Sequence, residues 1–353
     1  CAADYFPFGK TEWISRETCI GGTGMDKKKK LRILILTVVA LALAIALPHI
    51  LNNDYYMVVI NRILINTIVV LGLNFITGLT GQMNLGTAGI YALGAYSSAL
   101  FVTYTGLSPW LGLFVALLMG LLIGRALGYP SLRIRGVYLS LTTIGFAEVV
   151  RLLLANLADF TGGTTGLKNI PCYSIFGFAF NTQIRMYYLF LVMAAFAFFV
   201  AWRIVHSKWG RVFKSLRDNI DAVEMTGVDV ASMKIKAFTI ASIYGTIGGA
   251  MYADFMGYIN PSTFTIDLST NYVIMLMVGG LESVVGCLVG SIVVTGLPEV
   301  LRFLGDYYQI VFLTVILIGA IFFPNGWLDL AVRGVKKLRT KLGFAPVESK
   351  GGE

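Results

Sequence analysis

The side chains that most often carry out catalysis or bind metals are few in this sequence and far apart. Histidine occurs only at positions 49 and 206, and the four cysteines show no CxxC spacing. Zinc sites need clustered ligands, and disulfide frameworks need regularly paired cysteines. The sequence therefore predicts no metal site, no catalytic residues and no resident cofactor, and Cys172 and Cys287 are expected to be small apolar fillers.

A nucleotide-binding loop is also missing from the sequence. The only Gly-Lys-Thr, at residues 9–11, has Asp4 where the P-loop pattern requires its first glycine. Any ATP hydrolysis linked to this chain is therefore expected on separate ATPase subunits, and the chain itself is expected not to be an enzyme.

A glycine-rich segment that carries two amide side chains interrupts two apolar runs. Residues 78–89 read GLTGQMNLGTAG. Irregular backbone at membrane depth survives only where protein or a water-filled cavity surrounds it, and its free N–H and C=O groups can meet a polar substrate. A tight cytoplasmic turn whose small residues pack helices together is an equally good interpretation.

Charged residues inside apolar stretches are the other candidates, because each costs about 2.5–3.5 kcal/mol at mid-membrane. Glu148 and Arg151 are three residues apart and share a helix face, so they are expected to neutralise one another. Asp254 and Glu282 have no evident local partner and are expected to lie close enough to an interface to be hydrated. No chain of carboxylates typical of a proton relay is present.

Composition shows what kind of elements must position these residues. The chain has 353 residues, of which 56% are hydrophobic and 13% charged, and its mean hydropathy is +0.75. A soluble domain has about 25% charged residues, so a water-soluble globule is excluded. Stretches of about 20 apolar residues predict membrane-spanning helices. These lie near residues 31–48, 56–77, 83–104, 109–128, 136–157, 186–206, 234–257, 271–297 and 308–323.

The basic residues indicate the orientation of these helices. The net charge is +9, and 21 of the 28 Lys and Arg residues fall in residues 27–32, 125–135, 203–236 and the tail from 333. Cytoplasmic loops carry the excess of positive residues. This distribution predicts cytoplasmic N- and C-termini and some contact with anionic lipid, and it argues against nucleic-acid binding.

Nine spans would place the basic tail outside, so one predicted span must be double. Glycines at 279, 280, 286 and 290 interrupt residues 271–297, and a break there would form two short helices or a re-entrant hairpin. The predicted fold is all-α, a polytopic integral membrane helix bundle of 8–10 spans with broken or re-entrant segments.

The organisation along the chain follows from these patterns. Residues 1–24 differ in composition from the rest, and Met25 precedes a basic flank and an apolar run, so residues 1–24 are expected to be an upstream or non-native extension. Residues 25–335 form the predicted transmembrane domain, with the cytoplasmic segment 207–233 in it, and residues 336–353 form a basic cytoplasmic tail. Within residues 207–233, an amphipathic pattern predicts a short helix that Gly227 ends. Such a helix suits a partner's groove, or else lies on lipid headgroups.

Five motifs stand out along the chain. They are GLTGQMNLGTAGIYALGAYSSAL, LRIRGVYLSLTTIGFAEVVRLL, DFTGGTTGL, the segment from GRVFKSLRDNIDAVEMTGVDV to GGAMYA, and MLMVGGLESVVGCLVGSIVV. Together they resemble the permease subunits of branched-chain amino acid ABC importers. They follow the family's order across residues 56–323, and the LRIRG element is similar to the M-type subunit. Glu282 stands where many relatives have glycine. Similar permeases transport urea and short amides, so the resemblance identifies the type of transporter more closely than the transported solute.

The resemblance implies partners and site residues. The partners are a second permease subunit, two cytoplasmic ATP-binding subunits and an extracytoplasmic substrate-binding protein, in a bacterial cytoplasmic membrane. The residues bordering the substrate pathway would be Gly81, Gln82, Asn84, Gly86, Gly89, Thr142, Thr143 and Glu148. The residues coupling to the ATPases would be Gly210, Arg211, Ser215, Arg217, Asp218, Asn219, Ala222 and Gly227. An ion-coupled carrier that acts alone is the main rival, because two helix breaks could also serve such a mechanism.

Overall fold

The computed structural model describes residues 48, 53–134, 136–175, 178–180 and 182–322. The predicted span near 31–48, the extension 1–24, the start at Met25 and the tail 336–353 lie almost wholly outside the described residues. Everything below concerns residues 53–322, which belong to one compact unit.

Long helices dominate this unit, as the apolar runs predict. The helices of its first half are α2 (Asp54–Leu73), a π-helical turn η1 (Asn74–Leu79), α3 (Thr87–Thr105), α4 (Pro109–Gly128), α5 (Pro130–Arg133), α6 (Val137–Asn156) and α7 (Ala158–Thr161). Those of the second half are α8 (Gln183–Val205), α9 (Lys208–Asp218), α10 (Ile220–Met225), α11 (Val230–Met256), α12 (Ile266–Gly279), α13 (Val284–Val300) and α14 (Tyr308–Phe322). The all-α fold class is therefore confirmed.

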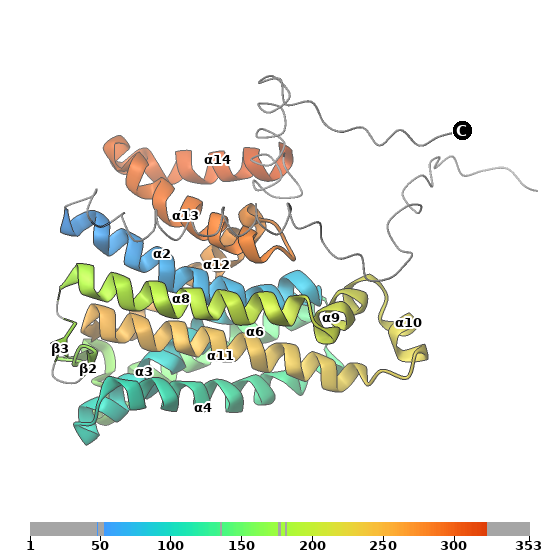
Figure 1. Cartoon of the computed structure of the whole chain (residues 1–353), viewed down its shortest axis with the longest axis horizontal. Helices are drawn as coiled ribbons and strands as arrows, with labels where there is room; N and C mark the ends of the chain where they lie inside the picture. The colour runs from blue at the N-terminus through green and yellow to red at the C-terminus, as the bar shows by residue number, and fades with distance from the viewer. Residues whose placement is uncertain (1–47, 49–52, 135, 176–177, 181, 323–353) are drawn as a thin grey trace, which may run out of the picture. The chain divides into compact units, whose positions relative to one another are not determined.

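Strands and 3₁₀ turns occupy only the connections. β1 (Leu167–Lys168) pairs antiparallel with β4 (Tyr258–Ile259), and β2 (Ser174–Ile175) pairs with β3 (Phe178–Ala179). The 3₁₀ turns are η2 (Gly163–Thr165), η3 (Pro261–Thr263) and η4 (Leu301–Tyr307). Figure 1 shows β2 and β3 at one end of the long helices and α9 and α10 at the opposite end.

Five helical segments among the described residues are long and apolar enough to cross a membrane. They are Asp54–Leu79, Pro109–Arg133, Val137–Asn156, Gln183–Val205 and Val284–Phe303. Helices α3 and α11 were also expected as spans but do not meet this standard of apolarity. Both are rich in Gly, Ala, Ser and Tyr and are buried along much of their length, so they need fewer of the lipid-compatible side chains that surface helices carry.

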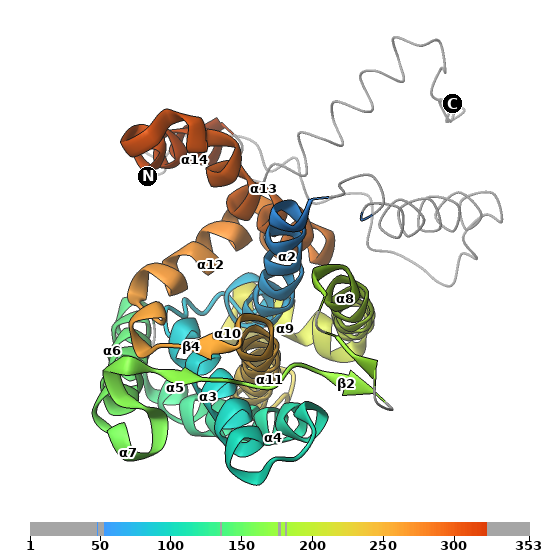
Figure 2. The same cartoon turned by 90° about the vertical axis from the view of Figure 1, so that its left-hand side faces the viewer.

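Helix α11 packs along α4, α3 and α2, and Figure 2, which looks along the bundle, shows it among these helices and α8. Small residues permit this close packing. A Cβ atom added at Gly94 of α3 would overlap the backbone of Thr246 on α11, and one at Gly249 of α11 would overlap the backbone of Tyr91 on α3. The glycines therefore let the backbones of α3 and α11 approach closely, as small residues do at helix interfaces in membranes.

The predicted double element near 271–297 is confirmed as two helices. α12 ends at Gly279, the chain turns through residues 280–283, and Ser283 caps α13 by accepting a hydrogen bond from the Gly286 N–H at 3.0 Å. Gly280 at φ +100° and Glu282 at φ +68° make this turn. The total of 8–10 spans stays a prediction, since part of the chain lies outside the described residues.

Candidate functional site

The glycine-rich segment forms a true interruption between α2 and α3. After the π-helical turn, residues 80–86 leave the helix, and Gly81 adopts φ +69°. Local bonds hold this break in shape: the Thr77 hydroxyl donates to the Gln82 carbonyl at 3.2 Å, and the Thr80 hydroxyl donates to the Ile76 carbonyl at 2.7 Å. The break therefore has a fixed backbone and exposes groups that a continuous helix would hide.

The second half of the break forms a hydrogen bond with helix α6 and packs closely against it. Asn84 is buried, and its Oδ1 accepts from the Gly86 N–H at 2.8 Å, while the Thr143 hydroxyl of α6 accepts from the Leu85 N–H at 3.1 Å. Gly86 and Gly89 approach α6 closely, since an added Cβ would meet the backbone of Thr143 or Ala147 respectively. The structure thus brings Asn84, Gly86, Gly89 and Thr143 together as a packed junction.

Two of the expected pathway residues lie elsewhere on α6. The Thr142 hydroxyl donates to the Tyr138 carbonyl at 2.9 Å on an exposed part of the helix. Glu148 forms an ion pair with Arg151, whose Nε lies 3.0 Å from Glu148 Oε2, so the predicted mutual neutralisation is confirmed. Neither residue joins the group around Gly81 and Gln82.

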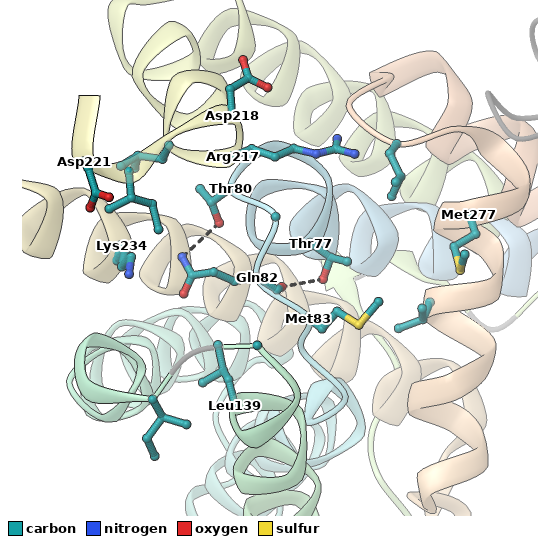
Figure 3. Close-up of a pocket in the computed structure, with 17 residues that line it drawn as sticks. Thr77, Thr80, Gln82, Met83, Leu139, Arg217, Asp218, Asp221, Lys234 and Met277 are labelled. Carbon is teal, nitrogen blue, oxygen red and sulfur yellow. Dashed lines mark hydrogen bonds between the residues drawn. The ribbon is translucent and has the colours of Figure 1, made fainter. Parts of the chain in front are cut away.

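A cavity of about 530 Å³ lies beside the first half of the break. Its wall includes Gly81, Gln82 and Met83 from the break and residues from α6, α9, α10, α11 and α12 (Figure 3). Figure 3 shows Gln82, Lys234 and Asp221 gathered at one side of the view, and Met83 and Met277 at the other. The cavity is therefore lined by charged, polar and apolar side chains together.

The predicted amphipathic segment begins as expected but is two helices. Ser207 caps α9 by accepting from the Trp209 N–H at 3.1 Å, and the buried face of α9 consists of Gly210, Phe213 and Leu216. The expectation of a single helix ended by Gly227 is wrong, because the chain becomes extended at Asn219. The Asn219 side chain accepts from the Ala222 N–H at 3.1 Å and so starts α10, a role that asparagine fills better than a helix interior.

The expected coupling residues divide between the two faces of this segment. Arg211, Asp218, Asn219, Ala222 and Gly227 are exposed. Gly210 is buried against the backbone of Val205, and the Ser215 hydroxyl donates to the Val212 carbonyl at 2.9 Å. Arg217 reaches toward the bundle: its Nη1 donates to the Gly78 carbonyl at 2.8 Å, where the π-helical turn ends.

Glu282 has partners that the sequence did not show. Its carboxylate lies 2.7 Å from Arg217 Nη1 and 3.3 Å from Lys214 Nζ, both on α9, and its backbone N–H donates to Asn74 Oδ1 at 3.1 Å. Both partners stand far from Glu282 in the sequence, so local spacing could not indicate them, and the Glu282 side chain is 36% exposed, in keeping with the expected hydration. Three elements, α9, the π-helical turn and the α12–α13 turn, meet at this one carboxylate.

Asp254 is also placed differently from the expectation of hydration near an interface. Its residue is 0% exposed near the end of α11, neither carboxyl oxygen has a hydrogen-bond partner among the described residues, and the buried Tyr173 side chain is its electrostatic neighbour. Tyr173 lies some 80 positions earlier in the sequence, so no local spacing could have indicated the pair.

Lys234 and Asp221 are cavity residues that the sequence interpretation missed. Lys234 is only 5% exposed although it stands in the first turns of α11. Because Lys234 stands at the start of an apolar stretch, its charge counts among the positive residues that flank the predicted spans and indicate their orientation. The available signal was that Lys234 is the first residue of the predicted span 234–257, where a lysine stem can pack along apolar surface.

Apolar helices in a bundle, with a fixed break beside a polar cavity, define this chain as a multi-pass helical membrane protein of the transport type. Comparison with known proteins agrees. Residues 55–321 match the family described as branched-chain amino acid transport system / permease component, and the chain belongs to this family. The resemblance noted in the sequence is thereby confirmed.

Individual relatives show the same relationship. The chain is 31% identical over 283 residues to the high-affinity branched-chain amino acid transport system permease protein LivM of Escherichia coli, covering 74% of this chain and 67% of that protein. It is 24% identical over 221 residues to a probable LivM of Methanocaldococcus jannaschii, covering 60% and 64%. It is also 24% identical over 206 residues to the autoinducer 2 import system permease protein LsrC of Yersinia pseudotuberculosis, covering 55% and 56%. No solved structure is significantly similar to the chain.

Proposed function

We propose that this permease is the M-type subunit of an ATP-driven importer that translocates leucine, isoleucine and valine across the bacterial cytoplasmic membrane. It pairs with a second permease subunit, with two cytoplasmic ATP-binding subunits and with an extracytoplasmic substrate-binding protein. Both termini of the chain lie in the cytoplasm. The family and the LivM relatives support this function.

The observation that carries the mechanism is the contact between α9 and the π-helical turn η1 that leads into the break. Arg217 of α9 binds the Gly78 carbonyl, while Arg211, Asp218 and Asn219 of the same segment remain exposed. In the proposed mechanism the exposed side of α9 and α10 docks on an ATPase subunit. Closure of the ATPases on ATP then moves α9, and α9 moves the break.

Transport follows by alternating access of the helix bundle to the two sides of the membrane. ATP shifts the balance between the two conformations only through its different affinity for each of them. The break residues Gly81 and Gln82 line the pathway in this proposal. Asn84, Gly86, Gly89 and Thr143 hold the break in place, and Thr142 and Glu148 border the pathway where a second permease subunit meets α6.

The test is to reconstitute the purified assembly with its binding protein and to measure ATP hydrolysis and uptake with each solute. Leucine, isoleucine and valine are expected to stimulate both, while urea and short amides are not. Asp218→Ala is expected to lower leucine-stimulated hydrolysis while the ATPase subunits still co-purify. Uphill uptake by the isolated chain without nucleotide would contradict the proposal and favour an ion-coupled carrier.

The second candidate function is transport of a different solute by the same type of ABC importer. The Yersinia relative is named as an autoinducer 2 import system permease protein, so a protein similar in sequence is named for a solute other than a branched-chain amino acid. Stimulation by urea or an amide, with no response to leucine, would favour this alternative.

A further inference from the structure

Exposed aromatic and basic side chains gather where α8 ends and α9 begins. Trp202, Arg203 and His206 lie at the end of α8, and Lys208 and Trp209 lie in the first turn of α9. All five side chains are exposed, Trp202 by 45% and Trp209 by 46%. We call these five residues the basic–aromatic cluster. Figure 1 shows α9 beyond the end of α8, away from β2 and β3.

The cluster continues a face of α8 that suits contact with lipid. Helix α8 is long and apolar enough to cross a membrane. Val192 is 67%, Phe196 69% and Phe199 65% exposed on this helix. Tryptophan is enriched at the membrane–water interface, because its ring is apolar and its N–H is polar. Trp202 is therefore at the position where the lipid-facing part of α8 meets the headgroups.

Ring contacts hold polar side chains of the cluster in place. The rings of Trp202 and His206 stack with their centroids 4.2 Å apart. His206 Nδ1 also donates to the Trp202 carbonyl at 2.9 Å, since a carbonyl oxygen can only accept. Lys236 of α11 places its Nζ 5.4 Å from the centroid of the Trp209 ring, a cation–π contact. The ammonium group of Lys236 therefore adds a positive charge beside the cluster.

These positive charges have no carboxylate partner within the described part of the chain. None of the ion pairs found there includes Arg203, Lys208 or Lys236. Guanidinium and ammonium groups form their strongest hydrogen bonds with ionised oxygens, including those of phosphate. The cluster therefore offers several exposed positive groups to an anion, next to an apolar surface.

The charge of the amphipathic segment changes sign along its length. Lys208 is exposed at its start, whereas Asp218, Asp221 and Glu224 are exposed at the end of α9 and in α10. An anionic membrane surface attracts basic residues that lie close to it, and it repels carboxylates. The sequence left open whether this segment lies in a partner's groove or on lipid headgroups, and the two interpretations suit its opposite ends.

We infer that the basic–aromatic cluster binds the headgroup of an anionic phospholipid in the cytoplasmic leaflet. Arg203, Lys208 and Lys236 face the phosphate, Trp202 and Trp209 lie at the level of the glycerol, and the acyl chains run along the exposed face of α8. The acidic end with α10 stays free for the ATPase subunit. This inference rests on the proposed function only for the orientation in the membrane, and it adds a lipid site to the permease.

The decisive experiment titrates the purified complete assembly with dioleoyl phosphatidylglycerol or dioleoyl phosphatidylcholine, without solute and without nucleotide. Native mass spectrometry measures the binding constant of the first lipid. Phosphatidylglycerol is expected to bind at least about tenfold more tightly, because each basic residue near an anionic surface strengthens the attraction about fivefold. Raising the ionic strength about tenfold is expected to reduce this preference, because salt screens exposed charges.

Substitutions then locate the bound lipid. Arg203→Gln and Lys208→Gln are each expected to weaken phosphatidylglycerol binding about fivefold and to leave phosphatidylcholine binding unchanged, because phosphatidylcholine has no net charge. Recovery of the assembly is recorded for every variant.

Arg302→Gln is the matched control at the far end of α13. This arginine also lies over an aromatic ring, with 5.5 Å between its Cζ and the ring centroid of Tyr55. The Tyr55 hydroxyl is hydrogen-bonded to Glu299, so a carboxylate lies close to the Arg302 charge. Arg302→Gln is therefore expected to change phosphatidylglycerol affinity less than about twofold.

Several outcomes would overturn the inference. These are equal affinity for the two lipids, phosphatidylglycerol binding that Arg203→Gln and Lys208→Gln leave unchanged, and an equal fall in the Arg302→Gln control. Loss of ATPase subunits from the Lys208→Gln assembly with lipid binding intact would also overturn it, because the cluster would then belong to the ATPase interface. Uptake and solute-stimulated ATP hydrolysis are measured separately, so failure of the lipid site and failure of the proposed function are distinguishable.

Discussion

Arg217 on α9 and Glu282 in the turn between α12 and α13 form an ion pair of 2.7 Å, and the same guanidinium nitrogen lies 2.8 Å from the Gly78 carbonyl. Their side chains are 32% and 36% exposed. An ion pair this accessible contributes at most about 1 kcal/mol to stability. Its larger consequence is structural, because Arg217 connects α9 both to the π-helical turn before the first break and to the turn between α12 and α13.

Charge reversal tests this link. Arg217→Glu or Glu282→Arg alone is expected to lower the ratio of transport to ATP hydrolysis by about fivefold or more, a typical size for coupling between sites. The double variant, which restores opposite charges, is expected to recover most of the ratio. Transport and hydrolysis are measured together in proteoliposomes.

Arg211 provides the control for that experiment. It lies on α9 but is exposed, and no ion pair joins it to Glu282. Arg211→Glu is expected to weaken association with the ATPase subunits, and Glu282→Arg is expected not to rescue it. Equal rescue of both variants would show that the Arg217–Glu282 pair acts only through general surface charge.

Two glycines of α13 make a matched pair for testing backbone contact. A Cβ atom at Gly290 would overlap the carbonyl oxygen of Met275 on α12, whereas one at Gly296 would meet nothing within 4 Å. Gly290→Ala is expected to destabilise the protein by about 1–3 kcal/mol through overpacking. Gly296→Ala is expected to be neutral or to stabilise it by up to about 1 kcal/mol through helix propensity. Melting temperatures of the two purified variants check this, and a similar fall in both would contradict the close contact.

The buried side chain of Tyr173 holds the connection between η2 and α8 against the helix bundle. It is 0% exposed, its ring centroid lies 5.2 Å from that of Trp110, and its hydroxyl is buried without a hydrogen-bond partner among the described residues. Burial raises the pKa of the Tyr173 phenol well above its usual value, with the Asp254 charge adding to the effect, so the hydroxyl remains protonated at neutral pH.

Removal of the Tyr173 ring is therefore expected to be costly. Tyr173→Ala should lower the unfolding free energy by about 3–5 kcal/mol, the usual cost of deleting a buried aromatic ring. Tyr173→Phe keeps the ring and removes only a hydroxyl that has no hydrogen-bond partner among the described residues, so it should change the unfolding free energy by less than about 1 kcal/mol. Thermal unfolding of the two variants checks the order, and an equal loss would show that the hydroxyl, not the ring, is the anchor.

The Glu148–Arg151 pair on α6 predicts the behaviour of single and double substitutions. Each side chain neutralises the other within one helix. Glu148→Leu leaves an unpaired arginine in an apolar segment, which costs about 2.5–3.5 kcal/mol on insertion scales. We therefore expect less Glu148→Leu protein in the membrane fraction. Glu148→Leu combined with Arg151→Leu should restore the amount, as quantified by immunoblotting, and failure to do so would mean that the charges have another partner.

The sequence by itself determined the elements and the family. Runs of apolar residues require helices in a bilayer because every backbone group must bond within its own segment, and α2, α4, α6 and α8 follow the predicted runs within a few residues. Both interruptions, at residues 80–86 and 280–283, could be predicted because glycine clusters mark them. The Glu148–Arg151 pair could be predicted because its partners are three positions apart on one helix.

Only the tertiary structure decided which distant side chains meet. Arg217 and Glu282 are 65 positions apart, and Tyr173 and Asp254 are farther apart still, so helix periodicity carried no information about either pair. The burial of Lys234 likewise depends on α11 packing beside the break rather than on its own neighbours in the sequence. Contacts between helices depend on how their faces are oriented by the whole bundle, and that orientation arises from the summed packing of all the helices.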